Sequence, residues 1–326
     1  MLSLVVPCYN EEGNVHDFFS EVNRVFKDKV DDYEFVFVND GSTDKTYQRL
    51  KEIHKSSPQN VQVISFSRNF GKEGAIYAGL SHTKGDLVCL IDADLQQRPE
   101  VVLEMLDTLH ADEDLDCVTA CQKKRREGKL MSGIKSLFYK LINKVSDVRF
   151  ENGASDFRLM KRNMVDAILS MTEYHRFSKG IFSYVGFNTK YIPYEAVERA
   201  KGESKWGFRK LFKYAFEGIF AFSTAPLKLS TYVGIFSSLA SIIYLIVVLI
   251  QKLAFDIPVP GYATLVVLIL FIGGVQLFCL GMLGSYISKM YVQGKNRPVY
   301  IIRERLDSTG KITTPTSDTE CEGKNE

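Results

Sequence analysis

The sequence lacks the spacings by which cysteine and histidine usually hold a metal. Its six cysteines include no C-x-x-C pair, and its five histidines include no H-x-x-x-H pair. A zinc site is therefore not expected. At 326 residues the chain is also far longer than the small domains that depend on disulfides. We expect the scattered cysteines to be reduced thiols in a protein that faces the cytosol.

The sequence also lacks the two common phosphate-binding loops and a signal peptide. No G-x-x-x-x-G-K-[ST] occurs, and no G-x-G-x-x-G follows the first apolar run. The opening "MLSLVVPCYNEE" has no basic start, and its apolar run is too short for a secretion signal. We expect these residues to form a first buried strand instead.

Neither sign of charge dominates the composition. The chain has 41 Lys and Arg against 39 Asp and Glu, which gives a formal net charge of +2. This balance gives no argument for nucleic acid as a partner, so any basic surface must be local.

The apolar residues are concentrated near the end of the chain. No residue is charged between 229 and 251 or between 257 and 288, and about 20 apolar residues of helix suffice to cross a bilayer. We predict two transmembrane helices, at about 229–251 and 262–288, joined by a Pro- and Gly-containing turn into a hairpin. Lysines and arginines flank both outer ends, which predicts that the rest of the chain and both termini are cytoplasmic. The alternative is a pair of buried helices in a soluble core.

The first 120 residues alternate short β-rich runs with helical patterns. The runs "LSLVVP", "EFVFVND", "VQVISFS" and "DLVCLID" read as strands, and 12–27 and 43–56 have helical spacing. This order predicts an α/β fold with a mostly parallel sheet covered on both faces. Ligands of such sheets bind beyond the carboxyl ends of the strands. Polar loops follow all four runs, so they should meet at one edge.

Two acids stand at the end of the fourth strand, in "LIDADLQQRPE". Side chains two residues apart in an extended chain point to the same side, so Asp92 and Asp94 should face one point. Paired carboxylates suit a hard divalent cation such as Mg²⁺ or Mn²⁺, which shares its other positions with substrate phosphates. An Asp-x-Asp arises easily by chance, and only its place at this edge gives it weight.

Two further segments have helical spacing with basic residues between the apolar ones. They lie at about 129–145 and 207–222, and helices of this kind lie in a membrane interface. The alternative is that each packs on the protein's own core; the interface is favoured for 207–222, and the two readings are even for 129–145. We therefore divide the chain into a cytosolic domain at 1–225, a hairpin at 229–290 and a cytosolic tail at 291–326. The tail is polar and expected to be disordered from about residue 307.

Six motifs, in this order, carry a family resemblance. They are "VVPCYNEE", "VFVNDGSTDKT", "RNFGKEGAIYAGL", "LIDADLQQRPE", "GASDFRLMKR" and "RAKGESKW". Together they resemble the family 2 glycosyltransferases of GT-A fold, and within them the polyprenyl-phosphate monosaccharide transferases. The resemblance covers roughly residues 2–225, and the hairpin is similar to that of the bacterial members. It implies a GT-A, Rossmann-like mostly parallel sheet followed by interface helices and the hairpin.

The resemblance also implies a reaction. An inverting enzyme would move a monosaccharide from a nucleotide-sugar to polyprenyl phosphate, undecaprenyl phosphate in bacteria, at the cytoplasmic face of the cell membrane. The donor would be UDP-glucose or UDP-N-acetylglucosamine, with GDP-mannose as an alternative. Mg²⁺ or Mn²⁺ would be the cofactor. Gly281 and Ser285 could pack helices together, either within the hairpin or between chains, and the second case would give a homo-oligomer.

Site residues follow from the resemblance, position by position. The catalytic residues would be Asp94 and Asp156, and the metal ligands Asp92, Asp94 and Gln96. The nucleotide-sugar contacts would be Pro7, Tyr9, Asn10, Glu11, Asp40, Lys72, Asp92, Arg199 and Lys205. The acceptor phosphate would be bound by Arg125, Ser204 and Lys205. The chain departs from the family pattern at Gln122, where relatives often have arginine.

Two other classes of function compete with this reading. A processive polysaccharide synthase should have more membrane spans and the Q-x-x-R-W motif, which is absent. A catalytically silent membrane scaffold would not need intact acids at 92, 94 and 156. Taken alone, Asp40 and Asp44 in "NDGSTD" could simply be turn and helix-capping residues.

Overall fold

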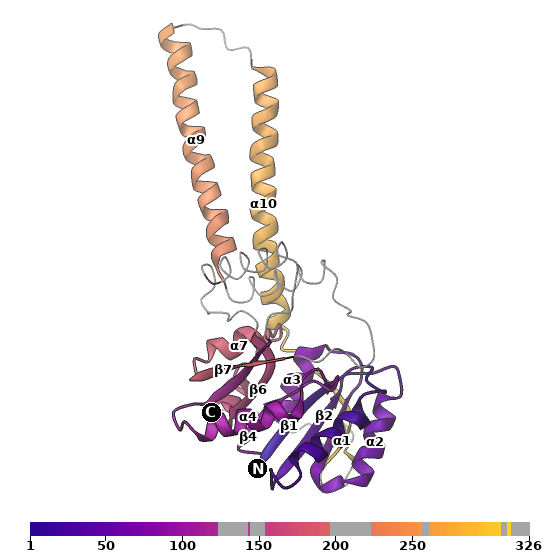
Figure 1. Ribbon diagram of the computed structural model, residues 1–326. Helices are drawn as coiled ribbons and strands as arrows, with labels where there is room; N and C mark the ends of the chain where they lie inside the picture. Colours follow the sequence, from indigo (N-terminus) through magenta and orange to yellow (C-terminus); the bar gives the residue numbers. More distant parts are fainter. Residues whose placement is uncertain (123–142, 144–153, 196–222, 256–260, 308–311, 314–326) are drawn as a thin grey trace, which may run out of the picture.

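The computed structural model describes residues 1–122, 143, 154–195, 223–255, 261–307 and 312–313. They form an α/β domain and two long helices that rise from it (Figure 1). The interface helices predicted at about 129–145 and 207–222 lie outside the described residues, apart from residue 143.

A nine-stranded sheet forms the centre of the α/β domain, in the order β7-β5-β6-β4-β1-β2-β3-β8-β9. Its strands are β1 (Leu2–Cys8), β2 (Tyr33–Asn39), β3 (Val61–Phe66), β4 (Leu87–Leu90), β5 (Cys117–Gln122), β6 (Ala154–Lys161), β7 (Thr189–Tyr194), β8 (Ile302–Leu306) and β9 (Ile312–Thr313). The first four strands are parallel, because each is followed by a helix that returns the chain to the same end. The expected α/β sheet is confirmed.

Helices cover both faces of the sheet. They are α1 (Val15–Phe26), α2 (Thr46–Ser56), the 3₁₀ turn η1 (Pro58–Asn60), α3 (Lys72–Ser81), α4 (Pro99–His110), α6 (Arg162–Leu169) and α7 (Ser178–Tyr184). The apolar residues of α1, α2 and α4 share one core with β1 and β2. Those of α3, α6 and α7 pack on the other face. Strands buried on both sides are mostly apolar, which explains the apolar runs "LVV" of β1 and "FVFV" of β2.

The end of the chain returns to the sheet after the hairpin. Strand β8 pairs antiparallel with β3, and β9 pairs with β8. Glu304 of β8 also accepts a bond of 2.8 Å from Lys51 Nζ of α2. The sequence did not predict this pairing. Apart from β9, the tail expected to be disordered from about residue 307 lies outside the described residues.

The two long helices are α9 (Ala225–Phe255) and α10 (Tyr262–Gly294). Both are long and apolar enough to cross a membrane, and neither candidate span is buried within the protein. The predicted spans lie inside them. So large an exposed apolar surface needs a lipid or protein cover, which supports a membrane hairpin over the alternative of buried core helices.

The hairpin lies on the side of the sheet where the parallel strands end. In Figure 1 the chain begins at the end of the sheet farthest from the helices, so the carboxyl ends of β1 to β4 point towards them. Gln293, near the end of α10, fixes this arrangement: its Oε1 accepts from Tyr174 N at 2.8 Å, and its Nε2 donates to Thr172 O at 3.3 Å.

Candidate active site

We call the four loops at residues 9–14, 40–45, 67–71 and 91–98 the carboxyl edge. The first two of these loops, after β1 and β2, are joined by hydrogen bonds. Asn10 Oδ1 accepts from Thr43 N at 2.9 Å, and Asn10 N donates to Ser42 Oγ at 3.0 Å. Glu11 N donates to Thr46 Oγ1 at 2.8 Å. The backbone of Asn10 is left-handed, with φ of 57°, a conformation that asparagine tolerates better than most residues. Two predicted nucleotide contacts thus also shape the edge.

Asp40 binds the loop at 67–71 to its own loop at 40–45. It is buried, and its carboxylate accepts from Phe70 N at 2.7 Å and from Gly71 N at 3.0 Å. Burial raises the pKa of Asp40, and the two backbone donors oppose that rise. Next to it, Gly41 has φ of +61°, and a Cβ there would lie 2.3 Å from the carbonyl carbon of Arg68. The loops are therefore packed too closely at this point for any residue but glycine.

The acid pair after β4 is held by its own turn. Gln97, a buried residue, accepts from Asp92 N at 2.9 Å and donates from Nε2 to Asp92 Oδ2 at 3.1 Å. Asp94 Oδ1 accepts from Gln96 N at 3.1 Å, and Leu95 between them is left-handed, with φ of 56°. The sequence did not single out Gln97, although the second glutamine of "DLQQ" was the available signal, and the metal-ligand role of Gln96 stays a prediction.

Asp156 reaches the carboxyl edge from a distant part of the chain. It lies near the start of β6, and β6 runs antiparallel to β4 with Arg158 opposite Leu90. An antiparallel strand begins where its parallel neighbours end, which brings Asp156 beside the acid pair. The "SDFRLM" and "DAD" segments therefore meet at the carboxyl edge.

Lys72, the first residue of α3, bridges the two acidic segments. Its Nζ lies 2.8 Å from Asp92 Oδ1, 3.0 Å from Asp92 Oδ2 and 3.1 Å from Asp156 Oδ2. Burial alone would lower the pKa of Lys72, but the charges of the two acids outweigh it and raise that pKa. The lysine predicted to contact the nucleotide-sugar is thus held by carboxylates in this structure.

Two further cations, which sequence analysis did not single out, surround Asp156. Burial opposes ionisation of its carboxyl, but the charges of Lys72, Lys179 and Arg158 outweigh burial and hold the pKa of Asp156 below its usual value. Arg158 is buried and lies over the ring of Phe182 at 3.7 Å. Asp156 is therefore an anion at neutral pH, available to balance positive charge.

The donor set of the acid pair fits a divalent cation that is completed by substrate. Among the residues that the structure describes, no group of three or more His, Cys, Asp or Glu side chains could hold a metal alone. Asp92 and Asp94 supply hard oxygen ligands at the end of a strand. Mg²⁺ typically binds one or two carboxylates and fills its remaining positions with phosphate oxygens and water, so two carboxylates suffice for such a site.

The other predicted site residues divide into two groups. Pro7 is the next-to-last residue of β1, and Tyr9 is exposed on the carboxyl edge, so both lie near the residues described above. Outside the described residues are Arg125, Arg199, Ser204 and Lys205.

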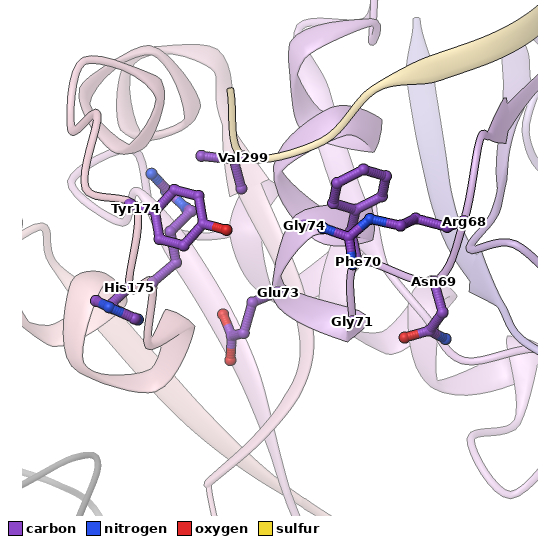
Figure 2. Close-up of a pocket in the computed structure, with 10 residues that line it drawn as sticks. Arg68, Asn69, Phe70, Gly71, Glu73, Gly74, Tyr174, His175 and Val299 are labelled. Carbon is purple, nitrogen blue, oxygen red and sulfur yellow. The ribbon is translucent and has the colours of Figure 1, made fainter. Parts of the chain in front are cut away.

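A cavity of about 340 Å³ lies beside the first turn of α3, lined by the loop before that helix, by residues 174–176 and by Val299 after α10 (Figure 2). Its lining residues are Arg68, Asn69, Phe70, Gly71, Glu73, Gly74, Tyr174, His175, Arg176 and Val299. Glu73 Oε2 accepts from Ser178 N at 2.8 Å and from Ser178 Oγ. The cavity therefore lies between the chain that follows α10 and the start of α3, the helix that begins with Lys72.

Two regions of the sequence match known protein families. Glycosyl transferase family 2 matches residues 3–169, and the GtrB C-terminal hairpin matches residues 225–290. The chain is 43% identical over 304 residues to CsbB of Bacillus subtilis (strain 168), whose name describes it as a glycosyltransferase; the match covers 93% of this chain and 92% of CsbB. It is also 43% identical over 304 residues to the SfII prophage-derived bactoprenol glucosyl transferase of Shigella flexneri, covering 93% of this chain and 97% of the relative.

Among solved structures, the chain is similar to glucosyl-3-phosphoglycerate synthase from Mycobacterium tuberculosis in complex with Mn²⁺, uridine diphosphate and phosphoglyceric acid. The identity is 18% and the TM-score 0.48, over 68% of this chain and 76% of the synthase.

The matches to the two families and to full-length relatives lead to one conclusion. The chain belongs to glycosyl transferase family 2, as a member with the GtrB type of C-terminal hairpin.

Proposed function

We propose that this glycosyltransferase moves a glucosyl unit from UDP-glucose to undecaprenyl phosphate at the cytoplasmic face of the membrane. The observation that carries the proposal is the position of the carboxyl edge, on the side of the sheet that faces the hairpin. A nucleotide-sugar is soluble, whereas the tail of a polyprenyl phosphate stays in lipid, so the two substrates can meet only close to the membrane surface. The named bactoprenol glucosyl transferase at 43% identity supports this acceptor and this sugar.

The cytoplasmic orientation rests on charge. Lys228 lies in the first turn of α9, and Lys295, Arg297 and Arg303 follow the membrane-spanning part of α10. An excess of lysine and arginine beside short hydrophobic segments favours the cytoplasmic side, which is also where a nucleotide-sugar is available.

The acceptor needs little help to become a nucleophile. The second pKa of a phosphate monoester lies near ~6, so most of the acceptor is already a dianion at pH 7. Asp156 is therefore proposed to act on the sugar: its anionic carboxylate, held by Lys72 and Lys179, balances positive charge that develops at the anomeric carbon. A fixed carboxylate does this without reorganising when the bond to the leaving group breaks.

The leaving group is a nucleoside diphosphate, whose negative charge must be neutralised. When bound by Asp92 and Asp94, Mg²⁺ or Mn²⁺ would supply that neutralisation as a Lewis acid. Gln97 holds Asp92 in position by two hydrogen bonds. The loops joined through Asn10 and Asp40 are proposed to receive the nucleotide base and ribose. By resemblance, Arg125, Arg199, Ser204 and Lys205 would bind donor and acceptor phosphates.

A transfer assay tests the proposal directly. The purified full-length protein, in detergent with Mg²⁺ or Mn²⁺ and undecaprenyl phosphate, is incubated with labelled UDP-glucose, UDP-N-acetylglucosamine or GDP-mannose. Label should enter the lipid phase from UDP-glucose, and Asp94→Asn should abolish this. The matched control is Asp107→Asn, which removes an exposed carboxylate from α4 and should retain activity. Transfer from UDP-N-acetylglucosamine or GDP-mannose alone would show that the proposed donor is wrong. The absence of a lipid product from every donor would contradict the proposal.

A further inference from the structure

Lys72 lies at a place where a positive side chain needs an explanation. It is the first residue of α3, after Gly71 in a left-handed conformation with φ of 94°. The amino end of a helix carries partial positive charge and therefore disfavours a cation. The compensation comes from outside the helix, because the ammonium contacts both Asp92 and Asp156.

These contacts place one ammonium between a predicted metal ligand and the proposed catalytic carboxylate. A single Nζ within 3.1 Å of both side chains means that the two carboxylates lie close together. Two like charges at such a site would repel each other if no cation stood between them. Lys72 therefore supplies positive charge at the position where charge is required before any substrate arrives.

We infer that Lys72 is a built-in counter-cation of the donor-free site, which leaves Asp92 when a divalent cation and the donor diphosphate bind. The inference rests on the proposed metal-dependent transfer and adds to it a competition between the ammonium and the metal for the same carboxylate. The displaced ammonium then has the diphosphate as a new partner, since a lysine is a mobile point charge on a flexible stem. This exchange of partners accounts both for the observed ion pairs of Lys72 and for the nucleotide contact that the family resemblance implies.

The competition has a thermodynamic consequence. Metal that binds without donor must break the ion pair of Lys72 with Asp92 and leaves the ammonium without that partner. Donor diphosphate that binds with the metal provides a replacement. Metal and nucleotide should therefore bind with positive coupling, and by reciprocity each should raise the affinity for the other by the same factor.

The test is a titration of the full-length protein with Mn²⁺ in the absence of donor. Binding is measured as the loss of the electron paramagnetic resonance signal of free Mn²⁺. Removing a unit charge that lies a few ångströms from the metal should strengthen binding, so Lys72→Met should bind Mn²⁺ at least about tenfold more tightly than the wild type. Lys72→Arg retains the charge and should stay within about twofold. Lys55→Met is the matched control, because it removes an exposed lysine from the last turn of α2, outside the carboxyl edge. It should also leave Mn²⁺ affinity unchanged.

A second titration measures the coupling. Saturating UDP should tighten Mn²⁺ binding in the wild type and should do so much less in Lys72→Met. Equal or weaker Mn²⁺ binding by Lys72→Met, or no binding by either protein, would overturn the inference. Neither titration requires turnover, so the result is independent of the transfer assay. Tighter Mn²⁺ binding by Lys72→Met without any lipid product would support the role of Lys72 as a counter-cation and contradict the proposed reaction.

Discussion

Gln97→Leu should destabilise the protein by removing the two hydrogen bonds that hold Asp92. One bond runs from Asp92 N to Gln97 Oε1 at 2.9 Å, and the other from Gln97 Nε2 to the Asp92 carboxylate at 3.1 Å. A neutral hydrogen bond contributes about 0.5–1.5 kcal/mol and one to a charged group about 1.5–3 kcal/mol. The expected loss is therefore about 2–4 kcal/mol in the free energy of unfolding.

The assay is the melting temperature of the purified full-length protein in detergent, and Gln96→Leu provides the comparison. The loss at Gln97 corresponds to a decrease of roughly 5–15 °C for a domain of this size. Gln96 contributes its backbone N–H to Asp94 Oδ1, which leucine retains, so Gln96→Leu should change stability by less than about 0.5 kcal/mol. Equal melting temperatures for the two variants would refute the assignment of Gln97 as the residue that positions Asp92.

Three other changes have defined outcomes. Asp156→Asn should lower kcat by about 10²–10³-fold with little change in donor KM, and near-normal turnover would remove Asp156 from catalysis. Gly41→Ala forces both a positive φ and a 2.3 Å approach to the backbone of Arg68, so it should cost about 2–5 kcal/mol in denaturant unfolding. Gly186→Ala shares the positive φ but has 3.9 Å of space, and should cost only about 1–2 kcal/mol; equal costs would exclude the close packing of the loops. Burial raises the pKa of Glu73, so the folded state binds more protons than the unfolded chain between about pH 4.3 and that raised value. Stability should fall as pH rises through this window and should fall less steeply in Glu73→Gln, where Asp40 still contributes; parallel melting profiles would contradict the shift.

The sequence was informative wherever the pattern was local. Apolar runs followed by polar loops predicted the four parallel strands and the edge where they end, because strand and turn preferences are read over a few residues. The long uncharged runs predicted α9 and α10 for the same reason. The position of Asp156 beside Asp92 depends instead on the register of β6 against β4, which only the family resemblance anticipated.

Features that depend on distant pairing were missed or placed differently. The contact of Lys72 with two carboxylates joins three separate segments of the chain, and no spacing in the sequence encodes it. Gln97 was missed because its contact with Asp92 depends on the turn between them, in which Leu95 is left-handed; the metal-ligand role of Gln96 stays a prediction. The proposed roles of Arg125, Arg199, Ser204 and Lys205 stay predictions.

The pairing of β8 with β3 links the completion of the catalytic sheet to the order of synthesis. Strand β8 comes after both long helices in the sequence, so the ribosome must make the whole hairpin before this strand exists. Until then β3 is an open edge, the kind of edge that pairs with other chains. Domains form progressively as the chain emerges, and here the closing strand arrives only when α9 and α10 are available for insertion. The time for which a new chain exposes the edge of β3 is therefore set by the synthesis of α9 and α10, and the sheet can be completed only after both helices have been made.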